Sequence, residues 1–482
     1  MTRSRRACLP STTIARSNNA VAVALSLLVG ACAHAAPQTR GAAGAREAPP
    51  PHLRGPADGG SDVGHAEHTD PVPDPAAGTD VSLGGMLAFA DQRSPVLTVA
   101  RSTRSRAEAA RVAASILLPT NPEVSVAAGP RFGISGTGVG VDVDVTLMQQ
   151  IQIAGERGLR IDAADALRDL TDAEIEQMRW AVHCDVHAAF HRALVEQERA
   201  RLAERVVTFQ QEVLRVVERQ ISAGETAPLA LRLAQAEVAQ AQQVLVAAQQ
   251  ALLASRIRLA QLSGWPVATP PVPAGAVDSP RDPSPLERLS AVARERLPSL
   301  RAGAARIREA EARSTLADRE AWPRPSLGLQ YRREGNPTSE GAYDIVMGVV
   351  SIPIPSFQLN QGERARARAD VTVAEAELDA SRLLLDGQIA EARSEVVAAA
   401  ARTRAYGTEI LPRFEENLTL LRRSFELGEI DILALSTGRE RFLRIQSDAL
   451  GAQQDYFVAL AGLERVVGVD LWRDDHHEES TP

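Results

Sequence analysis

Hydrophobic and polar residues alternate along the segment that begins at Val139. Single polar or small residues separate the apolar positions, which are Val139, Val141, Val143, Val145 and Leu147. A period of two residues is typical of a β-strand with one apolar and one polar face. The pattern predicts two strands, over about 122–133 and 138–152.

A second pair of strands is predicted over about 325–333 and 342–354. Its later strand shows the same alternation, through Tyr343, Ile345, Met347 and Val349. Strands of roughly nine to twelve residues match the length of a β-strand that crosses a membrane.

Long stretches suited to helices follow the strands. The chain has no glycine between Gly158 and Gly224, and no proline in the same stretch. A helix over about 156–222 is predicted, and at about 1.5 Å per residue it would span roughly 100 Å. No compact core is that deep, so the helix is suited to a duct, a stalk or a coiled-coil spacer. A similar helix is predicted over about 362–426, where Pro412 should kink or split it.

The chain contains this plan twice. Short motifs recur 203 or 204 positions apart, among them Gly224-Glu225 with Gly428-Glu429 and Leu262-Ser263-Gly264 with Val466-Val467-Gly468. In each copy a helix (about 82–118 or 285–321) precedes the strands, and a return helix (about 228–263 or 432–467) follows the long helix. Such a spacing indicates a tandem duplication.

The return helices carry a seven-residue repeat of apolar residues. The first copy has Leu231, Val238, Leu245, Leu252 and Leu259 in this repeat, and the second has Leu435, Phe442, Ala449, Tyr456 and Leu463. A seven-residue repeat predicts a left-handed supercoil with knobs-into-holes packing. The repeat alone does not distinguish a duct from any other antiparallel coiled coil.

The N-terminus has the pattern of an export signal. Several arginines precede a short apolar run that ends at Val29, and the junction Val29-Gly30-Ala31-Cys32 resembles a bacterial lipobox. Cys32 would then become the lipidated first residue, and Ala33 lacks the aspartate that resembles an inner-membrane retention signal. The alternative is ordinary cleavage near Ala33-His34-Ala35.

The predicted organisation has six segments. They are a lipoprotein-type signal peptide (1–31), a flexible tether rich in Pro, Gly and Ala (32–79), a first repeat (80–264), an inter-repeat linker (265–284), a second repeat (285–472) and a charged tail containing histidine (473–482).

Composition excludes several functional classes. The formal net charge is −8 and aromatic residues make up 4% of the chain, which argues against nucleic-acid binding and favours long, closely packed helices. No phosphate loop, catalytic triad or cofactor motif is present, so we expect no enzyme and no cofactor. No later stretch is apolar enough for a transmembrane helix.

The predicted strands favour a membrane location. A four-stranded open sheet exposes unpaired backbone groups at its edges, which lipid does not tolerate. Three copies of four strands would give a closed sheet of twelve. The alternative is a small soluble sheet buried on one face. The expected fold is therefore mostly α-helical, with a small contribution from each chain to a trimeric β-barrel and an α-helical tunnel.

Taken together, the two repeats of helix, hairpin, long helix, glycine turn and return helix resemble the TolC family of outer-membrane efflux ducts, over about residues 80–472. This resemblance implies a homotrimer in the outer membrane. Its tunnel would cross the periplasm and dock through a periplasmic adaptor protein on an inner-membrane pump. The motif Val350-Ser351-Ile352-Pro353-Ile354-Pro355, followed by Asn360-Gln361-Gly362-Glu363, is similar to the cobalt–zinc–cadmium branch, which works with resistance-nodulation-division pumps.

The resemblance also assigns a function to the two glycine turns, as periplasmic tips where the adaptor docks. The residues expected there are Arg219, Gly224, Glu225 and Leu229 in the first copy, and Arg423, Gly428, Glu429, Asp431 and Leu433 in the second. The simpler interpretation is that these residues only reverse a helix hairpin, for which glycine supplies the positive φ.

Three histidines, His183, His187 and His191, recur every four residues on the predicted long helix. This spacing can place two imidazoles on one zinc ion. The same strip is also compatible with a solvated or interchain face. His476 and His477, among acidic residues, form either a weakly chelating tail or an ordinary charged terminus.

Acidic residues of the strands are candidates for a cation-attracting pore lining. Asp142, Asp144 and Asp344 would face the barrel lumen if the valine face meets lipid. Barrel interiors are polar in any case. Glu225, Glu429 and Asp431 are candidates for a similar ring at the tips.

The sequence therefore predicts the outer-membrane channel of a tripartite efflux system that exports heavy-metal cations passively. One alternative is a duct of the same fold for drugs, small molecules or type I secretion. Another is a periplasmic coiled-coil scaffold without a pore.

Overall fold

The computed structural model describes residues 72–75, 80–132, 139–224, 228–275, 279–335, 342–427 and 429–471. The described residues all belong to one compact unit. The predicted export signal with Cys32, most of the predicted tether, the tip residues Glu225 and Gly428 and the histidine-containing tail lie outside the described residues.

The first repeat begins with three helices where the sequence predicted one. They are α1 (Leu83–Arg93), α2 (Pro95–Ser102) and α3 (Arg104–Ser115). Pro95 forces the first break, because it has no N–H to continue the helix and disfavours helical geometry at Ser94. The long helix α4 (Glu156–Ser222) and the return helix α5 (Pro228–Ser263) confirm the predicted pair.

The second repeat follows the same order with more interruptions. Its opening helix is divided at Pro298 into α6 (Leu286–Arg296) and α7 (Pro298–Arg319). The long helix is divided into α8 (Gln361–Ala405), a π-helical turn η1 (Tyr406–Ile410) and α9 (Leu411–Glu426), and the return helix is α10 (Ile432–Val467). The π turn ends two residues before Pro412, whose missing N–H cannot bond the preceding turn, so the predicted interruption is confirmed.

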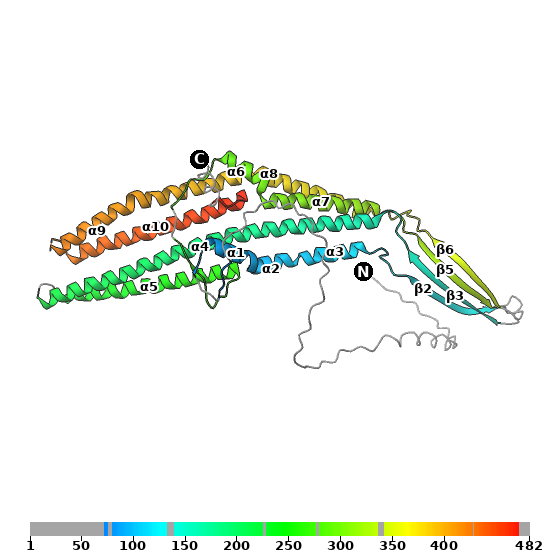
Figure 1. Cartoon of the computed structure of the whole chain (residues 1–482), viewed down its shortest axis with the longest axis horizontal. Coiled ribbons are helices and arrows are strands. Elements are labelled where there is room, and N and C mark those ends of the chain that lie inside the picture. Colours follow the sequence, from blue (N-terminus) through cyan, green and yellow to red (C-terminus); the bar gives the residue numbers. More distant parts are fainter. Residues whose placement is uncertain are drawn as a thin grey trace, which may run out of the picture. The chain divides into compact units, whose positions relative to one another are not determined.

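Four antiparallel strands form one sheet in the order β2-β3-β5-β6 (Figure 1). The strands are β2 (Glu123–Phe132), β3 (Val139–Gln150), β5 (Ser326–Gly335) and β6 (Ala342–Ser351). Each repeat supplies one hairpin, and the repeats meet where β3 pairs with β5. A second, parallel pair joins β1 (Asp80–Val81) to β4 (Val272–Pro273), so the predicted linker is packed against the start of the first repeat.

The heptad positions are buried in the second copy, whereas in the first copy only Leu259 is buried and the other four are half-buried. All five of the second copy are buried, with exposed fractions of 8% or less. In α5 the small residues Ala234, Ala241 and Ser255 are buried in the seam, and α5 makes its main contact with α4. Small residues allow this close approach, because a larger side chain would separate the helices.

Each return helix ends in a glycine that packs on the opening helices of its own repeat. Gly264 has φ +81° beside the carbonyl of Arg93, and Gly468 has φ +84° beside Leu297. Both neighbours stand just before the prolines that divide the opening helices. The repeated motifs of the sequence therefore form the same contact twice.

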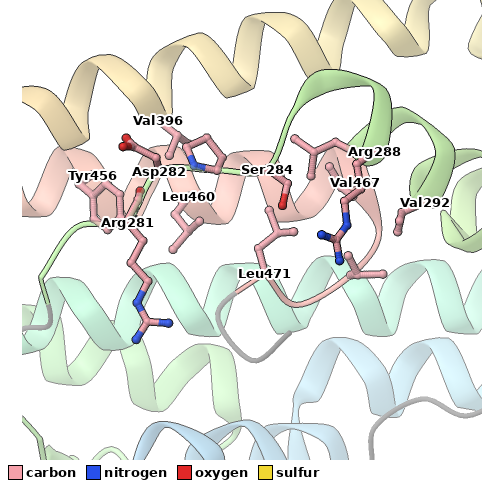
Figure 2. A pocket seen from close by; sticks show the side chains of 13 residues that line it. Arg281, Asp282, Ser284, Arg288, Val292, Val396, Tyr456, Leu460, Val467 and Leu471 are labelled. Carbon is pink, nitrogen blue, oxygen red and sulfur yellow. Dashed lines mark hydrogen bonds between the residues drawn. The ribbon is translucent and has the colours of Figure 1, made fainter. Parts of the chain in front are cut away.

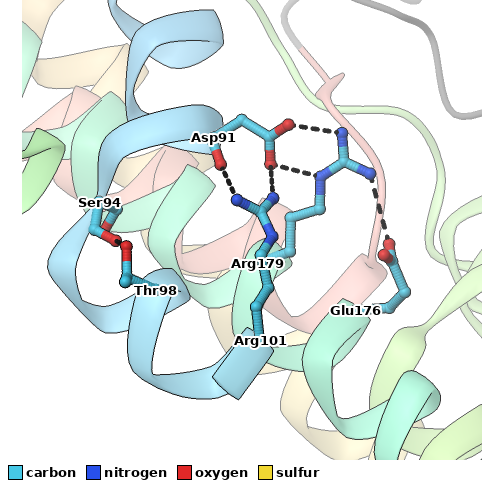
Figure 3. A network of polar contacts seen from close by, with 6 residues as sticks. All are labelled: Asp91, Ser94, Thr98, Arg101, Glu176 and Arg179. Carbon is cyan, nitrogen blue, oxygen red and sulfur yellow. Dashed lines mark hydrogen bonds and ion pairs between the residues drawn. The ribbon is translucent and has the colours of Figure 1, made fainter. Parts of the chain in front are cut away.

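Ion pairs link the opening helices to α4. Asp91 accepts hydrogen bonds from Arg179 Nε at 2.8 Å and from Arg101 Nη2 at 3.1 Å, and Arg101 Nη1 also donates to the Asp91 carbonyl oxygen at 2.6 Å (Figure 3). One carboxylate therefore holds α1, α2 and α4 together.

The linker also packs on the second repeat, over a small hollow of about 90 Å³ (Figure 2). Arg281, Asp282, Ser284 and Arg288 form its polar side. The Arg281 backbone N–H donates to the hydroxyl of Tyr456 at 3.0 Å, which anchors the linker to α10.

Candidate functional site

One face of the sheet is apolar and exposed. Directly opposed residues of an antiparallel pair have side chains on the same face, and Val145 is opposite both Val126 and Tyr331. The apolar residues of this face that are at least 44% exposed are Val124, Val126, Phe132, Val139, Val141, Leu147, Leu327, Leu329, Val346 and Val350. A contiguous surface of this kind is unusual in a soluble monomer and is typical of an interaction with lipid or protein.

The opposite face carries a network of paired charges. Arg131 Nε donates to Asp142 at 2.9 Å, and the same guanidinium lies 3.1 Å from Glu334. Arg332 Nε donates to Asp144 at 3.0 Å. Asp142 and Asp144 therefore lie opposite the valine face, as predicted, but each carboxylate is paired with an arginine and does not present an uncompensated acidic lining.

The prediction for Asp344 is wrong. Asp344 is opposite Arg333, which is opposite Val143, so its side chain lies on the apolar face. There Asp344 accepts a hydrogen bond from the Tyr331 hydroxyl at 2.8 Å. The error arose because β6 is apolar at both sets of alternating positions, so its pattern does not determine which set faces which side.

The alternating positions noted in the sequence of β6 lie on the charged side of the sheet; they are Tyr343, Ile345, Met347 and Val349. Ile345, for example, is opposite Arg332, the partner of Asp144.

The helix hairpins at the far end of the unit have exposed leucines. Leu229 is 77% exposed and Leu433 is 59% exposed. Gly224 has φ +76°, and no atom of the described residues lies within 4 Å of the position that a Cβ would occupy there, so its conformation alone requires glycine. Arg219 contributes its carbonyl oxygen to the turn, accepting from Ala223 N at 3.0 Å.

Several of the predicted docking residues form hydrogen bonds within the second hairpin turn itself. Asp431 is the N-cap of α10, because its carboxylate accepts from Ala434 N at 2.8 Å. The Glu429 N–H donates to Ser424 O at 2.9 Å, and the Arg423 carbonyl oxygen accepts from Leu427 N at 3.0 Å. The exposed leucines are therefore better candidates for partner contact than Asp431.

His187 and His191 face α10 of the same chain, and His183 faces the segment that follows α10. His187 Nδ1 lies 2.7 Å from Glu464 Oε2, and both side chains are buried. The His191 ring stacks on Phe457 with centroids 3.9 Å apart. His183 Nε2 lies 3.8 Å from Asp470 Oδ2. The strip is therefore a contact between the two repeats, and the solvated or interchain alternative is wrong for His187 and His191.

The histidine strip does not gather the ligands of a metal site among the described residues. Within the described ranges, no three His, Cys, Asp or Glu side chains are grouped so that they could hold a metal ion. Burial lowers the pKa of His187, but the Glu464 carboxylate outweighs this and raises it above 6.5. Burial, helped by the charge of His187, holds the pKa of His191 well below 6.5.

We expect His191→Phe to reduce the acid sensitivity of the protein. His191 is neutral in the folded state and charged below about pH 6.5 when unfolded, so wild-type stability falls as the pH drops, by up to about 1.4 kcal/mol per pH unit. Phenylalanine keeps the stack on Phe457 and does not titrate. Thermal unfolding at pH 7.5 and pH 5.5 should show that the lower pH reduces the stability of the variant less than that of the wild type. Equal reductions in stability would contradict this.

Glu464 and Arg332 were not singled out from the sequence. Glu464 lies beside Arg465 in the stretch 459–467, where the other residues are apolar or glycine, and a charged pair of this kind was the available signal. Arg332 gives no such signal, since its partner Asp144 is 188 residues away.

Solved outer-membrane channels share this fold. Campylobacter jejuni CmeC, an outer membrane channel, superposes with a TM-score of 0.64 at 12% identity, covering 83% of this chain and 89% of that one. CusC, whose structures are described in terms of folding and transmembrane channel formation, superposes with a TM-score of 0.62 at 14% identity. The match covers 84% of this chain and 96% of that one. The fold is thus that of a channel with a tandem helical tunnel and a barrel.

The sequence identifies the family. The model of outer membrane efflux proteins matches residues 88–265 and 289–469, and the chain belongs to this family. A relative, the cobalt-zinc-cadmium resistance protein CzcC of Cupriavidus metallidurans, is 25% identical over 319 residues, covering 66% of this chain and 75% of that protein. The predicted family and the prediction of a passive channel component that is not an enzyme are confirmed.

None of the described helices is both long and apolar enough to cross a membrane.

Proposed function

We propose that three copies of this chain form one channel in the outer membrane, with the helices extending as a tunnel into the periplasm. The observation that carries this proposal is the sheet, which combines an exposed apolar face with two outer edges, on β2 and β6, that have no strand partner among the described residues. Lipid requires these edges to be paired. Three four-stranded sheets would close into twelve strands, a size compatible with a pore.

We further propose that the channel serves a resistance-nodulation-division pump through a periplasmic adaptor and exports heavy-metal cations. The similarity to CzcC, a cobalt-zinc-cadmium resistance protein, supports this cargo, as does the motif Val350–Pro355 followed by Asn360–Glu363. The chain has no nucleotide motif, so energy and substrate selection would come from the pump.

A deletion strain tests the cargo. We expect loss of the gene to lower the tolerated concentrations of zinc, cobalt or cadmium, and the intact gene to restore them. Sensitivity to drugs without sensitivity to metals would instead identify the drug-efflux alternative. The purified protein should conduct in planar bilayers, and a water-soluble protein without conductance would indicate the scaffold alternative.

A lipid anchor at Cys32 is part of this proposal. It rests on the lipobox-like junction Val29–Cys32. Metabolic labelling with a palmitate analogue should mark the wild-type chain and not a Cys32→Ala chain, and labelling of both would exclude the assignment.

We propose that the adaptor docks on the exposed leucines of the helix hairpins. Leu229→Asp should therefore abolish metal tolerance, because it places a charge on the apolar contact, while the channel still assembles. Val99→Asp is the matched control, since Val99 on α2 is 67% exposed and Leu229 is 77% exposed. Metal tolerance, together with the mass of the purified assembly, measures the effect, and full tolerance in Leu229→Asp would remove Leu229 from the docking surface.

A further inference from the structure

Two exposed apolar segments stand at the helix-side end of the sheet, beside its two free edges. The first, Ile116–Leu118, leads from α3 into β2, and Leu117 is 70% exposed. The second, Ile352–Leu359, leads from β6 into α8, and in it Ile354 is 84% exposed and Phe357 is 86% exposed. Figure 1 shows that β2 and β6 occupy opposite edges of the sheet and both connect to helices at the same end.

Hydrogen bonds hold both segments in place. Arg160 Nη2 donates to Ile116 O at 3.1 Å, and Arg157 Nε donates to Ser115 O at 3.0 Å. In the second segment Gln361 Nε2 donates to Phe357 O at 2.9 Å, and the Leu359 N–H donates to Gln361 Oε1 at 2.8 Å. The backbone that carries Phe357 is thus hydrogen-bonded to the start of α8, and an exposed apolar surface of this kind is typical of a contact with protein or lipid.

Closure of the barrel brings the two segments together. In a ring of identical chains, the β2 edge of one chain meets the β6 edge of the next. Because β2 runs away from the helices and β6 runs toward them, this pairing is antiparallel, like every other pair in the sheet. Their flanking segments then lie at the same end of the same junction. Within one chain the two edges are separated by three strand spacings, or about 14 Å.

We propose that Ile352–Leu359 of one chain packs on Ile116–Leu118 of its neighbour and seals the junction between subunits where the barrel meets the tunnel. The occupant of this surface is a second copy of the chain. The inference rests on the proposed oligomeric channel and deepens it, since it names the residues that close the seam outside the strand ladder.

Cross-linking between two differently tagged full-length chains tests the seam. One chain carries Leu117→Cys and the other Phe357→Cys; they are co-expressed, and the purified channel is treated with a short bismaleimide. We expect a product of twice the chain mass that carries both tags. Native Cys184 should not contribute, because it is buried and burial raises the pKa of its thiol, and chains without added cysteine provide the blank.

The matched control pairs Leu117→Cys with Leu383→Cys. Leu383 is 82% exposed, close to the value for Phe357, but lies about 30 Å further along α8. A product with Phe357→Cys and none with Leu383→Cys would establish the seam.

Other outcomes would overturn the inference. Oligomeric channels that yield no doubly tagged product would exclude the seam and leave the proposed channel intact. Quenching of a fluorophore on Phe357→Cys by brominated lipid, without cross-linking, would show that lipid covers the segment. A monomer by light scattering without conductance would remove the proposed function and the seam together.

Discussion

Replacing Gly264 with alanine is expected to lower the free energy of unfolding by about 2–5 kcal/mol, and Gly468→Ala should do the same. Two costs combine at each site. The positive φ of +81° at Gly264 and +84° at Gly468 is unfavourable for a residue with a Cβ. The added Cβ would also overlap backbone, namely the Arg93 carbonyl oxygen at Gly264 and Leu297 Cα, 2.7 Å away, at Gly468.

The surrounding backbone has little freedom to relieve this overlap. Arg93 and Leu297 each precede a division between two helices. The residues that follow them are both buried: Ser94, which is 0% exposed, follows Arg93, and Pro298 follows Leu297. Moving either residue would separate the return helix from the opening helices of its repeat. The two variants should therefore behave alike although they lie 204 positions apart.

Gly387→Ala is the matched control. Gly387 lies in α8 with no atom of the described residues within 4 Å of the position of an added Cβ, and its φ is not positive. Alanine should stabilise the helix there by roughly 0.5–1 kcal/mol. Thermal unfolding of the detergent-solubilised protein, followed by circular dichroism, compares the three variants. A loss below 1 kcal/mol in Gly264→Ala would show that the contact relaxes easily.

Truncation of His187 is the second large effect, with an expected loss of about 3–5 kcal/mol for His187→Ala. The substitution leaves the Glu464 carboxylate buried, at 0% exposure, without its partner at 2.7 Å. The Leu471 N–H still donates to Glu464 Oε1 at 3.1 Å, but one neutral donor does not replace the imidazole. The contact joins α4 of the first repeat to α10 of the second, so its loss should loosen the repeats from each other.

The same two helices supply a control for this variant. Asp185 on α4 forms an ion pair with Arg465 on α10, and both side chains are nearly half exposed. Asp185→Ala should cost at most about 1 kcal/mol, because solvent screens the pair. Equal losses in His187→Ala and Asp185→Ala would show that burial does not decide the effect.

The pH dependence of this pair has a definite sign. The pKa of His187 is raised in the folded protein, so its contribution to stability is fully present below about pH 6.5 and is lost as the pH rises through the higher folded value. The contribution of His191 has the opposite sign. Urea unfolding of the wild type and of His191→Phe at pH values on both sides of 6.5 separates the contributions of the two histidines. The variant keeps His187 and lacks the imidazole of His191.

The sequence by itself determined the main elements of the two repeats and their order, although not the divisions of the opening helices or the short strands β1 and β4. The alternation from Val139 to Leu147, the glycine-free stretch of α4 and the heptads of α5 and α10 are local patterns, and local backbone geometry converts them into strands and helices. The spacing of 203 or 204 residues then revealed the duplication. These features were sufficient to identify the family before any contact was known.

Only the tertiary structure decided which of these residues meet. β6 is apolar at both alternating positions, so pairing with β5 was needed to place Asp344 on the valine face. The acidic residues Asp142 and Asp144 looked like a pore lining until Arg131 and Arg332 were found beside them. His187 and Glu464 are 277 residues apart, and the spacing of the histidines describes one face of α4 without naming its partner. Local periodicity records which side of an element is buried, whereas the identity of the neighbour depends on packing between distant segments.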